Sequence, residues 1–390
     1  MSYGLNGLGA VRSLGQLGIP VIAIGTSPTE PGLRSRYCKF PIVLPAAHTG
    51  PTRFQRALEP YLGQGLPLIP TSDPAAEFIS AHQEELKTGF RLAAPPPDAL
   101  AALIDKRLEY ELVAAAGVPM PRTVTRLSTD IEGSLASLGF PLILKPRTLE
   151  DSLSFGFKNL VVNSPAELES LLPIVSGQAD RLVAQEVVSG DDDMLWVCNA
   201  TFNSDSKLVC GMTFQRLGLS PAHFGVTTLA RSIHNPVVKD YSARLGRRLC
   251  WMGPAMFEFK WDGLRQEYVY IEINPRLGMC NWFDTRCGVN NVLATYLLAL
   301  GRESEIYDLA QTENLYYVSL VPDIFSRIED GESIGGILKR HACLFLRRRV
   351  GAYFYWRDPL PALDHGFRQS GRVVNGLIRR VKSRVSPSRD

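Results

Sequence analysis

Apolar residues form two kinds of pattern over residues 1–100. Continuous apolar runs predict strands at 20–25, 40–45, 66–70 and 91–94. Apolar positions three and four residues apart predict helices at 8–18, 52–63 and 74–87. Because strands that alternate with helices form parallel sheets, we expect a parallel α/β domain over residues 1–97.

The sequence GLNGLG (4–9) has the glycine spacing of a βα turn that binds a dinucleotide. Such a turn follows a strand, and an acidic residue ends the second strand. Only three residues precede Gly4, which leaves no room for the first strand, and the acid in GTSPTE (25–30) comes too late. We therefore do not expect a dinucleotide site.

Longer elements follow from residue 98. The pattern predicts a helix over 98–123 that is broken near Asp105-Lys106 and closed by Gly117, and then a buried strand at 139–147. Residues 148–159 are rich in serine and glycine, which indicates a loop. Further strands are expected at 159–162 and on both sides of an acidic turn in 181–202, with a helix at 165–176 between them.

A polar alternation marks YIEINPRLG (270–278). Successive side chains of a strand point to opposite faces, so Glu272, Asn274 and Arg276 would share one face and the isoleucines the other. A half-exposed edge strand with ordinary surface residues would show the same pattern. The segment before it decides in favour of a site.

That segment, 256–274, predicts a hairpin with Glu258 and Glu272 on its polar face. A two-residue turn at Asp262-Gly263 would misalign these carboxylates, so we expect a wider loop centred near 264–266. Two carboxylates beside the Asn274 oxygen repel each other unless a cation lies between them. Hard oxygen ligands suit Mg²⁺, which completes its shell with water and phosphate oxygens, so the hairpin predicts a nucleotide site.

Composition excludes several classes of protein. With 45% hydrophobic and 21% charged residues the chain is globular, and no apolar run reaches the roughly 18 residues of a membrane span. The N-terminus does not have the pattern of a signal peptide. The seven cysteines are scattered, without a CxxC pair, which fits a reducing compartment. We expect a cytoplasmic protein.

The basic charge is concentrated at the C-terminus. Residues 339–390 hold thirteen Lys and Arg against three Asp, or +10, and the rest of the chain is at −7 because the total is +3. Residues 373–385 place apolar side chains at helical spacing with arginines beside them. This segment either docks on the body of the protein, or lies on an anionic membrane surface, or holds an acidic polymer or a partner enzyme. Nucleic acid is not expected, and the oligomeric state stays open.

Five elements, in order and at suitable spacing, resemble the ATP-grasp fold, and more narrowly the carboxylate–amine ligases related to D-aspartate ligase. They are Lys106, Lys145, AQEVVSG (184–190), FEFK (257–260) and EINPR (272–276). The resemblance implies an ATP-grasp domain over 98–315, with a lid subdomain at about 124–190. Residues 1–97 would be the α/β domain that precedes it, and 316–390 a basic C-terminal extension.

The resemblance also implies roles for the nucleotide-binding residues. Lys106 and Lys145 would hold the triphosphate, and the loop 148–157 would close over it as a lid with Ser152 and Ser154. The segment Gln185, Glu186, Val187 and Val188 would read adenine, with Glu186 accepting from the exocyclic amine. Asp193 would take the ribose hydroxyls.

The implied reaction joins a carboxylate to an amine at the expense of ATP. Glu258, Glu272 and Asn274 would bind Mg²⁺, or Mn²⁺ in its place, and Arg276 would steady an acyl phosphate. The carboxylate would take the γ-phosphoryl group, and the amine would then displace phosphate to give an amide.

Three further residues are candidates for contact with substrate. Arg216 and Arg231 would grip a substrate carboxylate, or else form ordinary surface salt bridges. Asp73 would contact the amino substrate, or else belong to a helix cap together with Thr71 and Ser72.

Two other functions fit the same residues. One is a carboxylate kinase or carboxylase-like enzyme that phosphorylates carboxylate without forming an amide. The other is a non-catalytic ATP-binding module that the basic tail recruits to its target. A pure binding module has no need of the whole set Glu258, Glu272, Asn274 and Arg276, so we favour the ligase.

Overall fold

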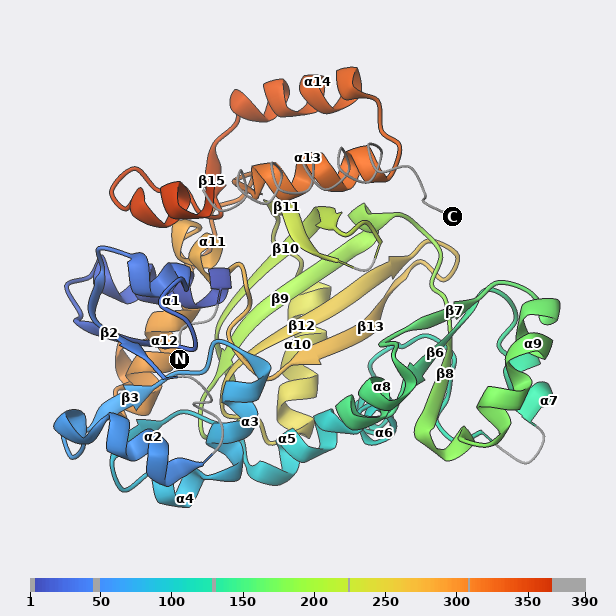
Figure 1. The fold of residues 1–390 in the computed structure, drawn as a ribbon, viewed down its shortest axis with the longest axis horizontal. Helices are drawn as coiled ribbons and strands as arrows, with labels where there is room; N and C mark the ends of the chain where they lie inside the picture. The colour runs from blue at the N-terminus through green and yellow to red at the C-terminus, as the bar shows by residue number, and fades with distance from the viewer. Residues whose placement is uncertain (1–3, 45–49, 128–130, 224, 308, 367–390) are drawn as a thin grey trace, which may run out of the picture.

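The structure is a computed structural model that describes residues 4–44, 50–127, 131–223, 225–307 and 309–366. The amphipathic segment at 373–385 therefore lies outside the described residues. The architecture is mixed helix and sheet, as predicted (Figure 1).

The N-terminal region contains the predicted strands and helices. Its elements are α1 (Gly4–Gly15), β1 (Val21–Gly25), β2 (Cys38–Val43), α2 (Pro51–Ala57), β3 (Leu66–Leu68), α3 (Asp73–Ala81), α4 (Gln83–Leu86) and β4 (Phe90–Leu92). The strands run parallel, as expected, but they form two separate pairs, β1 with β2 and β3 with β4. The helix predicted at 52–63 ends at Ala57 and is followed by a short 3-10 turn, Glu59–Tyr61.

The glycines of GLNGLG lie inside α1 and not in a phosphate-binding turn. A β-carbon on Gly9 would come within 2.2 Å of Asn281 Oδ1. Gly9 is therefore needed for the close approach of α1 to α11 (Asn281–Arg286).

A smaller subdomain carries a four-stranded antiparallel sheet in the order β5-β8-β6-β7. The elements that lead into it and form it are α5 (Pro97–Ile104), α6 (Lys106–Ala115), β5 (Thr123–Val124), α7 (Ile131–Ala136), β6 (Leu142–Pro146), α8 (Leu149–Phe155), β7 (Leu160–Val162), α9 (Pro165–Ser176) and β8 (Leu182–Glu186). The predicted break in the helix over 98–123 is confirmed, because Asp105 separates α5 from α6 and caps α6 by accepting from the Arg107 amide at 3.0 Å.

The main body is a seven-stranded sheet in the order β13-β12-β9-β10-β11-β14-β15. Its elements are β9 (Leu195–Phe202), β10 (Leu208–Ser220), β11 (Val226–Ser232), α10 (Pro236–Arg248), β12 (Gly253–Asp262), β13 (Glu267–Asn274), α11, α12 (Asn291–Ala299), β14 (Tyr316–Val318), α13 (Leu320–Glu329), α14 (Ile334–Phe345) and β15 (Arg349–Gly351). Two of these strands, β14 and β15, come from the part of the chain that the sequence assigns to a C-terminal extension.

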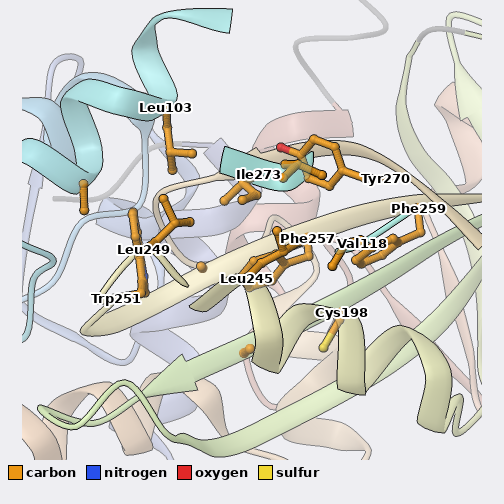
Figure 2. Packing of buried hydrophobic residues seen from close by; sticks show 14 of the residues in the cluster. Leu103, Val118, Cys198, Leu245, Leu249, Trp251, Phe257, Phe259, Tyr270 and Ile273 are labelled. Atoms are coloured by element: carbon orange, nitrogen blue, oxygen red, sulfur yellow. The ribbon is translucent and has the colours of Figure 1, made fainter. Parts of the chain in front are cut away.

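A hydrophobic core packs against each face of the seven-stranded sheet. On one face Phe257, Phe259 and Trp251 pack with Leu245 of α10 (Figure 2). On the other face Val197, Phe214 and Met256 pack against α11. Alternate residues of β12 thus point into different cores. Glu258 lies between Phe257 and Phe259 in the sequence, and its side chain points to the opposite face of the sheet.

The sequence interpretation of residues 148–157 as a loop is wrong. They contain the helix α8, which starts with a capping box between Thr148 and Asp151 and ends at Gly156 with a φ of 76°.

All seven cysteines are free thiols.

Candidate active site

The hairpin β12–β13 brings the two candidate metal carboxylates together. Glu258 is the direct cross-strand partner of Glu272, and a four-residue loop from Gly263 to Gln266 joins the strands. Directly paired residues project to the same face of an antiparallel sheet. The predicted register and the predicted wide loop are both confirmed. A bulge after Glu258 shifts the ladder by one residue, so that Phe259 pairs with Tyr270.

Four cations act electrostatically on the Glu272 carboxylate. The Nζ of Lys158 lies 4.0 Å from the Glu272 carboxylate. Burial raises the pKa of Glu272, but positive charge outweighs burial and leaves the pKa below its ordinary value. The charges responsible belong to Lys106, Lys158, Lys145 and Arg276. An ionised carboxylate among four cations is a setting that accepts further anionic groups.

Lys106 begins α6 and is held by an acid one turn further on. Its Nζ lies 2.7 Å from Oε2 of Glu109, whose side chain is fully buried. The Tyr270 hydroxyl donates to the other oxygen of Glu109. Burial lowers the pKa of Lys106, and the charges of Glu109 and Glu272 raise it above its ordinary value. The lysine is therefore a fixed cation and not a proton donor at neutral pH.

Lys145, on β6, is fixed by two neutral groups. Its Nζ donates to the Tyr110 hydroxyl at 2.9 Å and to Gln185 Oε1 at 2.8 Å. The Gln185 amide donates in turn to Thr123 Oγ1 at 2.9 Å. Neither hydrogen-bond partner of Lys145 is charged, so the ammonium is held in place without a direct ion pair.

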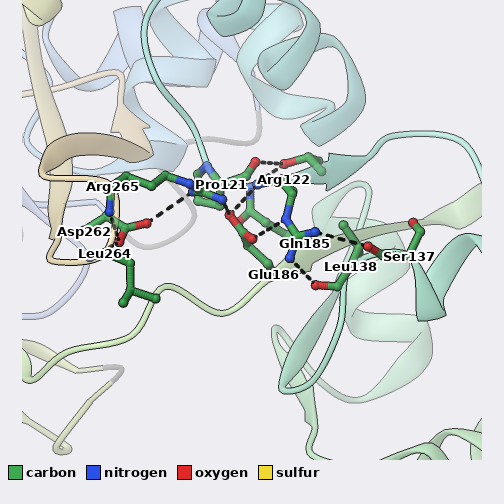
Figure 3. Close-up of polar contacts among 10 residues, drawn as sticks. Pro121, Arg122, Ser137, Leu138, Gln185, Glu186, Asp262, Leu264 and Arg265 are labelled. Atoms are coloured by element: carbon green, nitrogen blue, oxygen red, sulfur yellow. Dashed lines mark hydrogen bonds and ion pairs between the residues drawn. The ribbon is translucent and has the colours of Figure 1, made fainter.

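The segment expected to read adenine is held by cations that the sequence analysis missed. The Glu186 carboxylate accepts from the Arg122 amide at 2.8 Å and from Arg122 Nε at 2.6 Å, and it pairs with Arg265 (Figure 3). Lys260 donates to the carbonyl oxygens of Val188 at 2.9 Å and Gly190 at 2.7 Å. The structure thus ties the side chain of Glu186 to two guanidinium groups.

Val187, Val188 and Asp193 are also expected to contact the nucleotide. The Val187 amide donates to the Pro141 carbonyl at 3.2 Å, and Val188 is buried. Asp193 is exposed, and its carbonyl accepts from the Gln215 side chain at 2.7 Å. The carboxylate of the neighbouring Asp192 accepts a hydrogen bond from the His223 amide at 3.1 Å.

The lid serines belong to α8 and its end. The Ser152 hydroxyl donates to the Phe157 carbonyl at 2.9 Å, and the Ser152 amide donates to the Thr148 carbonyl at 3.0 Å. Ser154 is exposed. The backbone amide of Ser152 is thus used within the helix, which differs from the expected cradle of free amides.

Arg276 connects the hairpin to the N-terminal region. Its Nε lies 2.8 Å from Asp73 Oδ1, and its Nη2 donates to Asn274 Oδ1 at 3.0 Å. Ser72 caps α3 through its side chain, which leaves the Asp73 carboxylate to the arginine. The structure therefore brings together Asp73, Asn274 and Arg276.

The two candidate substrate arginines lie on different faces of the sheet. Arg216 is 7% exposed, and its Nη2 donates to Glu258 Oε1 at 2.6 Å. Arg231 is the cross-strand partner of Gln215, the neighbour of Arg216, so its side chain points to the opposite face. It donates to the Asn314 side chain at 2.9 Å. The structure brings Arg216 to the site and does not bring Arg231 there.

The donor set suits a hard divalent cation. Glu258, Glu272 and Asn274 offer oxygen atoms only, and the lowered pKa of Glu272 keeps it ionised at neutral pH. No group of three or more His, Cys, Asp or Glu that could hold a metal occurs in the described part of the chain. A metal ion at the hairpin would therefore need the Asn274 amide oxygen and oxygens of a ligand or of water in addition to the two carboxylates.

One missed residue could have been found in the sequence. Lys260 follows Glu258 by two positions in FEFK, and the alternation that places Glu258 on the polar face places Lys260 there as well. Lys158, Arg122 and Arg265 carry no such signal. Their partners lie far away in the chain, as with Arg122 and Glu186, which are 64 residues apart.

No protein-family model matches the chain. D-aspartate ligase of Enterococcus faecium is 27% identical over 235 residues, which make up 57% of this chain and 56% of that protein. The chain thus matches just over half the length of this curated relative.

Solved structures match a larger share of the chain. The ADP complex of N5-carboxyaminoimidazole synthetase from Staphylococcus aureus is 16% identical with a TM-score of 0.61, over 80% of this chain and 78% of that one. The biotin carboxylase domain of 2-oxoglutarate carboxylase from Hydrogenobacter thermophilus, solved with MgADP and bicarbonate, is 15% identical with a TM-score of 0.60, over 81% of this chain and 72% of that one. The chain therefore has the ATP-grasp fold that its sequence resemblance predicts.

Proposed function

We propose that this protein is an ATP- and Mg²⁺-dependent carboxylate–amine ligase that forms an amide through an acyl phosphate. One arrangement carries the proposal: the paired carboxylates Glu258 and Glu272 lie on one sheet face among fixed cations. A triphosphate brings the negative charge that these cations attract. The carboxylates repel each other unless a divalent cation lies between them.

The nucleotide would lie between the two sheets. Lys106 and Lys145 are fixed cations for its phosphates, and Lys158 is placed to reach the same charges. Because the Glu186 carboxylate is held by Arg122 and Arg265, we assign adenine recognition to the backbone of 185–188 and to the Lys260 contacts that fix it. Asp193 stays the candidate for the ribose, and Ser152 and Ser154 for the lid.

Glu258, Glu272 and Asn274 would hold Mg²⁺, which offsets charge on the phosphate oxygens when it is bound. In the structure Glu258 pairs with Arg216 and Asn274 accepts from Arg276. Both guanidinium groups therefore border the place where phosphoryl oxygens would lie. Arg216 is nine-tenths buried and its Nε has no hydrogen-bond partner among the described residues, so it has a donor left for a ligand oxygen.

The first chemical step forms one bond and breaks one. An oxygen of the substrate carboxylate attacks the γ-phosphorus, the bond between that phosphorus and the β,γ-bridging oxygen breaks, and ADP leaves. Arg276, with a planar fork of donors, would bind the acyl phosphate. Phosphorylation makes the carboxyl oxygen a good leaving group, which is the reason for using ATP.

In the second step the amine nitrogen attacks the acyl carbon. The bond from that carbon to the phosphate oxygen breaks, phosphate leaves, and the nitrogen loses a proton. No side-chain nucleophile is required. The sequence similarity to D-aspartate ligase makes D-aspartate the first carboxylate to test.

A carboxylase-like ligase that phosphorylates bicarbonate is the second candidate. It is favoured by the structural likeness to N5-carboxyaminoimidazole synthetase and to a domain solved with bicarbonate. The sequence relative described above, in contrast, is a D-aspartate ligase.

The test measures ADP release by the full chain with ATP, Mg²⁺ and a panel of carboxylates that includes D-aspartate, L-aspartate and bicarbonate. Hydroxylamine replaces the amine and traps an acyl phosphate as a hydroxamate. We expect ADP and hydroxamate in equal amounts with one organic carboxylate. ADP release with bicarbonate alone would favour the second candidate, and ATP binding without ADP release on any carboxylate would leave only a binding module.

A further inference from the structure

Helix α14 lies on the outer side of the molecule, alongside α13 (Figure 1). Several of its apolar side chains are exposed to solvent. Ile334 is 68% exposed, Leu338 65% and Phe345 73%. Leu346, which ends the helix, is 89% exposed. Ile337 and Leu344 are buried on an adjacent side of the same helix, about 90° from the exposed residues. Apolar side chains thus occupy both the side of α14 that packs against the protein and a side that faces solvent.

The exposed residues form one stripe. Ile334, Leu338 and Phe345 are separated by four and by seven residues, which places them on the same side of an α-helix. Single exposed apolar side chains are ordinary, whereas a continuous apolar surface marks a site of interaction. We call Ile334, Leu338, Phe345 and Leu346, together with Lys339, Arg347 and Arg348, the α14 surface.

The segment that carries this stripe is basic. Residues 333–357 contain six Lys and Arg and no Asp or Glu. Arg340 pairs with Glu332 at 2.9 Å, and the Arg349 guanidinium lies 3.8 Å from the Phe345 ring centroid. Lys339, Arg347 and Arg348 are exposed, and within the described ranges no acidic side chain lies at ion-pair distance from them.

Apolar side chains flanked by unpaired cations match the surface of an anionic bilayer. An interfacial helix buries its apolar side at the boundary of headgroups and acyl chains, and its basic residues contact the anionic headgroups. The core of a protein interface, in contrast, is depleted of lysine, although arginine is enriched there. None of the helices among the described residues has the length and hydropathy of a membrane span.

We propose that the α14 surface binds the surface of an anionic lipid bilayer. The binding site belongs to the folded body and does not depend on the basic residues after 366. It also shares no residue with the β12–β13 hairpin, so it stands whether or not the chain is a ligase.

The experiment is co-sedimentation of the full chain with phosphatidylcholine vesicles, with and without about a third of phosphatidylserine, at low salt. Two variants test the two components of the surface: Phe345→Ser with Leu346→Ser removes apolar contact, and Lys339→Gln with Arg347→Gln and Arg348→Gln removes charge. The matched control removes the same charge from the N-terminal region, at the exposed Arg53, Arg56 and Arg91. A fourth variant changes Arg379, Arg380, Lys382 and Arg384 to Gln in the full chain.

We expect the full chain to sediment with anionic vesicles and not with neutral ones. Each basic residue near such a surface contributes roughly five-fold to the partition, so the triple variant of the α14 surface should bind roughly 100-fold more weakly. The apolar variant should also lose binding, while the N-terminal control and the variant at 379–384 should retain most of it. Thermal melting of every variant, with an unchanged midpoint, shows that the fold is intact.

Three results would overturn the proposal. Equal sedimentation of the full chain with neutral and anionic vesicles is one, and no sedimentation with either at low salt is another. The third is loss of binding in the variant at 379–384 with retention in both α14 variants, which would assign the contact to the tail. The second result is the one expected if the α14 surface binds an acidic protein instead of lipid, because the chain would then not bind vesicles.

Discussion

Asp73, at the start of α3, and Arg276, just beyond β13, form an ion pair with an Nε–Oδ1 distance of 2.8 Å. The two residues are 203 positions apart in the chain. Because Arg276 also donates to Asn274, the pair fixes the guanidinium between the N-terminal region and the candidate metal ligands. We therefore expect Asp73 to position Arg276 for the proposed reaction, whether or not it also contacts an amino substrate.

The ion pair gives the first prediction. Arg276→Lys should lower the rate of hydroxamate formation by about 100-fold or more, because an ammonium cannot reproduce the planar fork that would bind the acyl phosphate. Asp73→Asn should lower kcat by roughly ten-fold and leave the KM for ATP unchanged, since the guanidinium keeps its other contacts. Steady-state kinetics of ADP release measure both effects.

The matched control for Asp73 is Asp98→Asn, since Asp98 also lies in the first turn of a helix and is exposed. It should leave kcat unchanged. An Asp73→Asn variant that raises only the KM of the amine would show a substrate contact in place of a positioning role. Near-normal hydroxamate formation by Arg276→Lys would assign the acyl phosphate to another residue.

The second prediction concerns the metal ligands. Glu272→Ala should abolish ATP turnover while the thermal midpoint stays close to that of the unchanged chain, because only the polar face of the hairpin loses a group. Glu272→Gln keeps an oxygen donor and removes a charge, so it should need a higher Mg²⁺ concentration for half-maximal ADP release. The control is Glu267→Gln on the same strand, which should behave like the unchanged chain. Mg²⁺-dependent turnover by Glu272→Ala would remove Glu272 from the metal site.

The hairpin was predictable because its information is local. Glu258 and Glu272 are close in the chain, and their alternation with core residues fixes both face and register once the loop length is known. The break before Lys106 was predictable for the same reason, since an aspartate at 105 is a helix cap. Residues 148–157 were misread because serine and glycine outweighed the signal in Thr148 and Asp151, whose spacing is that of a capping box.

The partners of the site residues could not be predicted. The pairing of Glu186 with Arg122 and Arg265 depends on how two sheets lie against each other, and no periodicity in the sequence encodes that arrangement. The face of Arg231 depends on the register of β10 with β11, which contains a bulge. Local pattern thus places a residue on a strand, and the tertiary fold decides what it contacts.

The third prediction is a pH dependence of stability. Asp284 is buried on α11, where burial raises its pKa to about 7 although the side chains of Asn199 and Asn291 donate to it. In the unfolded chain the group titrates near 3.8. Between these values the folded chain keeps a proton that the unfolded chain has lost, so raising the pH through this window favours unfolding. Above about pH 7 both states are ionised and the contribution is constant.

Asp284→Asn removes this titration. The free energy of unfolding of the unchanged chain, relative to that of the variant, should fall by up to about 1.4 kcal/mol per pH unit between pH 5 and pH 7. Urea titrations at pH 5, 6, 7 and 8 measure the difference. The substitution Asp240→Asn, on the surface helix α10, serves as the control, and its difference from the unchanged chain should not follow this slope. A constant difference for Asp284→Asn would show that the carboxyl is ionised throughout.

The last prediction concerns a buried ion pair that joins the two ends of the described chain. Arg12 of α1 donates through Nε to Asp358 Oδ2 at 2.9 Å, and both side chains are fully buried. The Ser35 hydroxyl and the Arg36 amide also donate to the Asp358 carboxylate, at 2.7 Å and 2.9 Å. The segment after β15 is thereby locked to the N-terminal region.

Removing one partner leaves the other charge buried without compensation. Asp358→Ala should therefore destabilise the fold by about 3–5 kcal/mol, measured by urea unfolding at pH 7. Replacing the pair by Arg12→Met with Asp358→Leu should be less destabilising than the single change, because no charge is then left unpaired. The control is Arg302→Ala, which breaks an exposed pair with Glu305 and should leave the unfolding curve unchanged. If Asp358→Ala unfolds at the same urea concentration as the unchanged chain, the segment after β15 is not part of the cooperative unit. In that case a chain ended just after β15 should keep the stability of the full chain, whereas the ion pair predicts that such a chain loses stability.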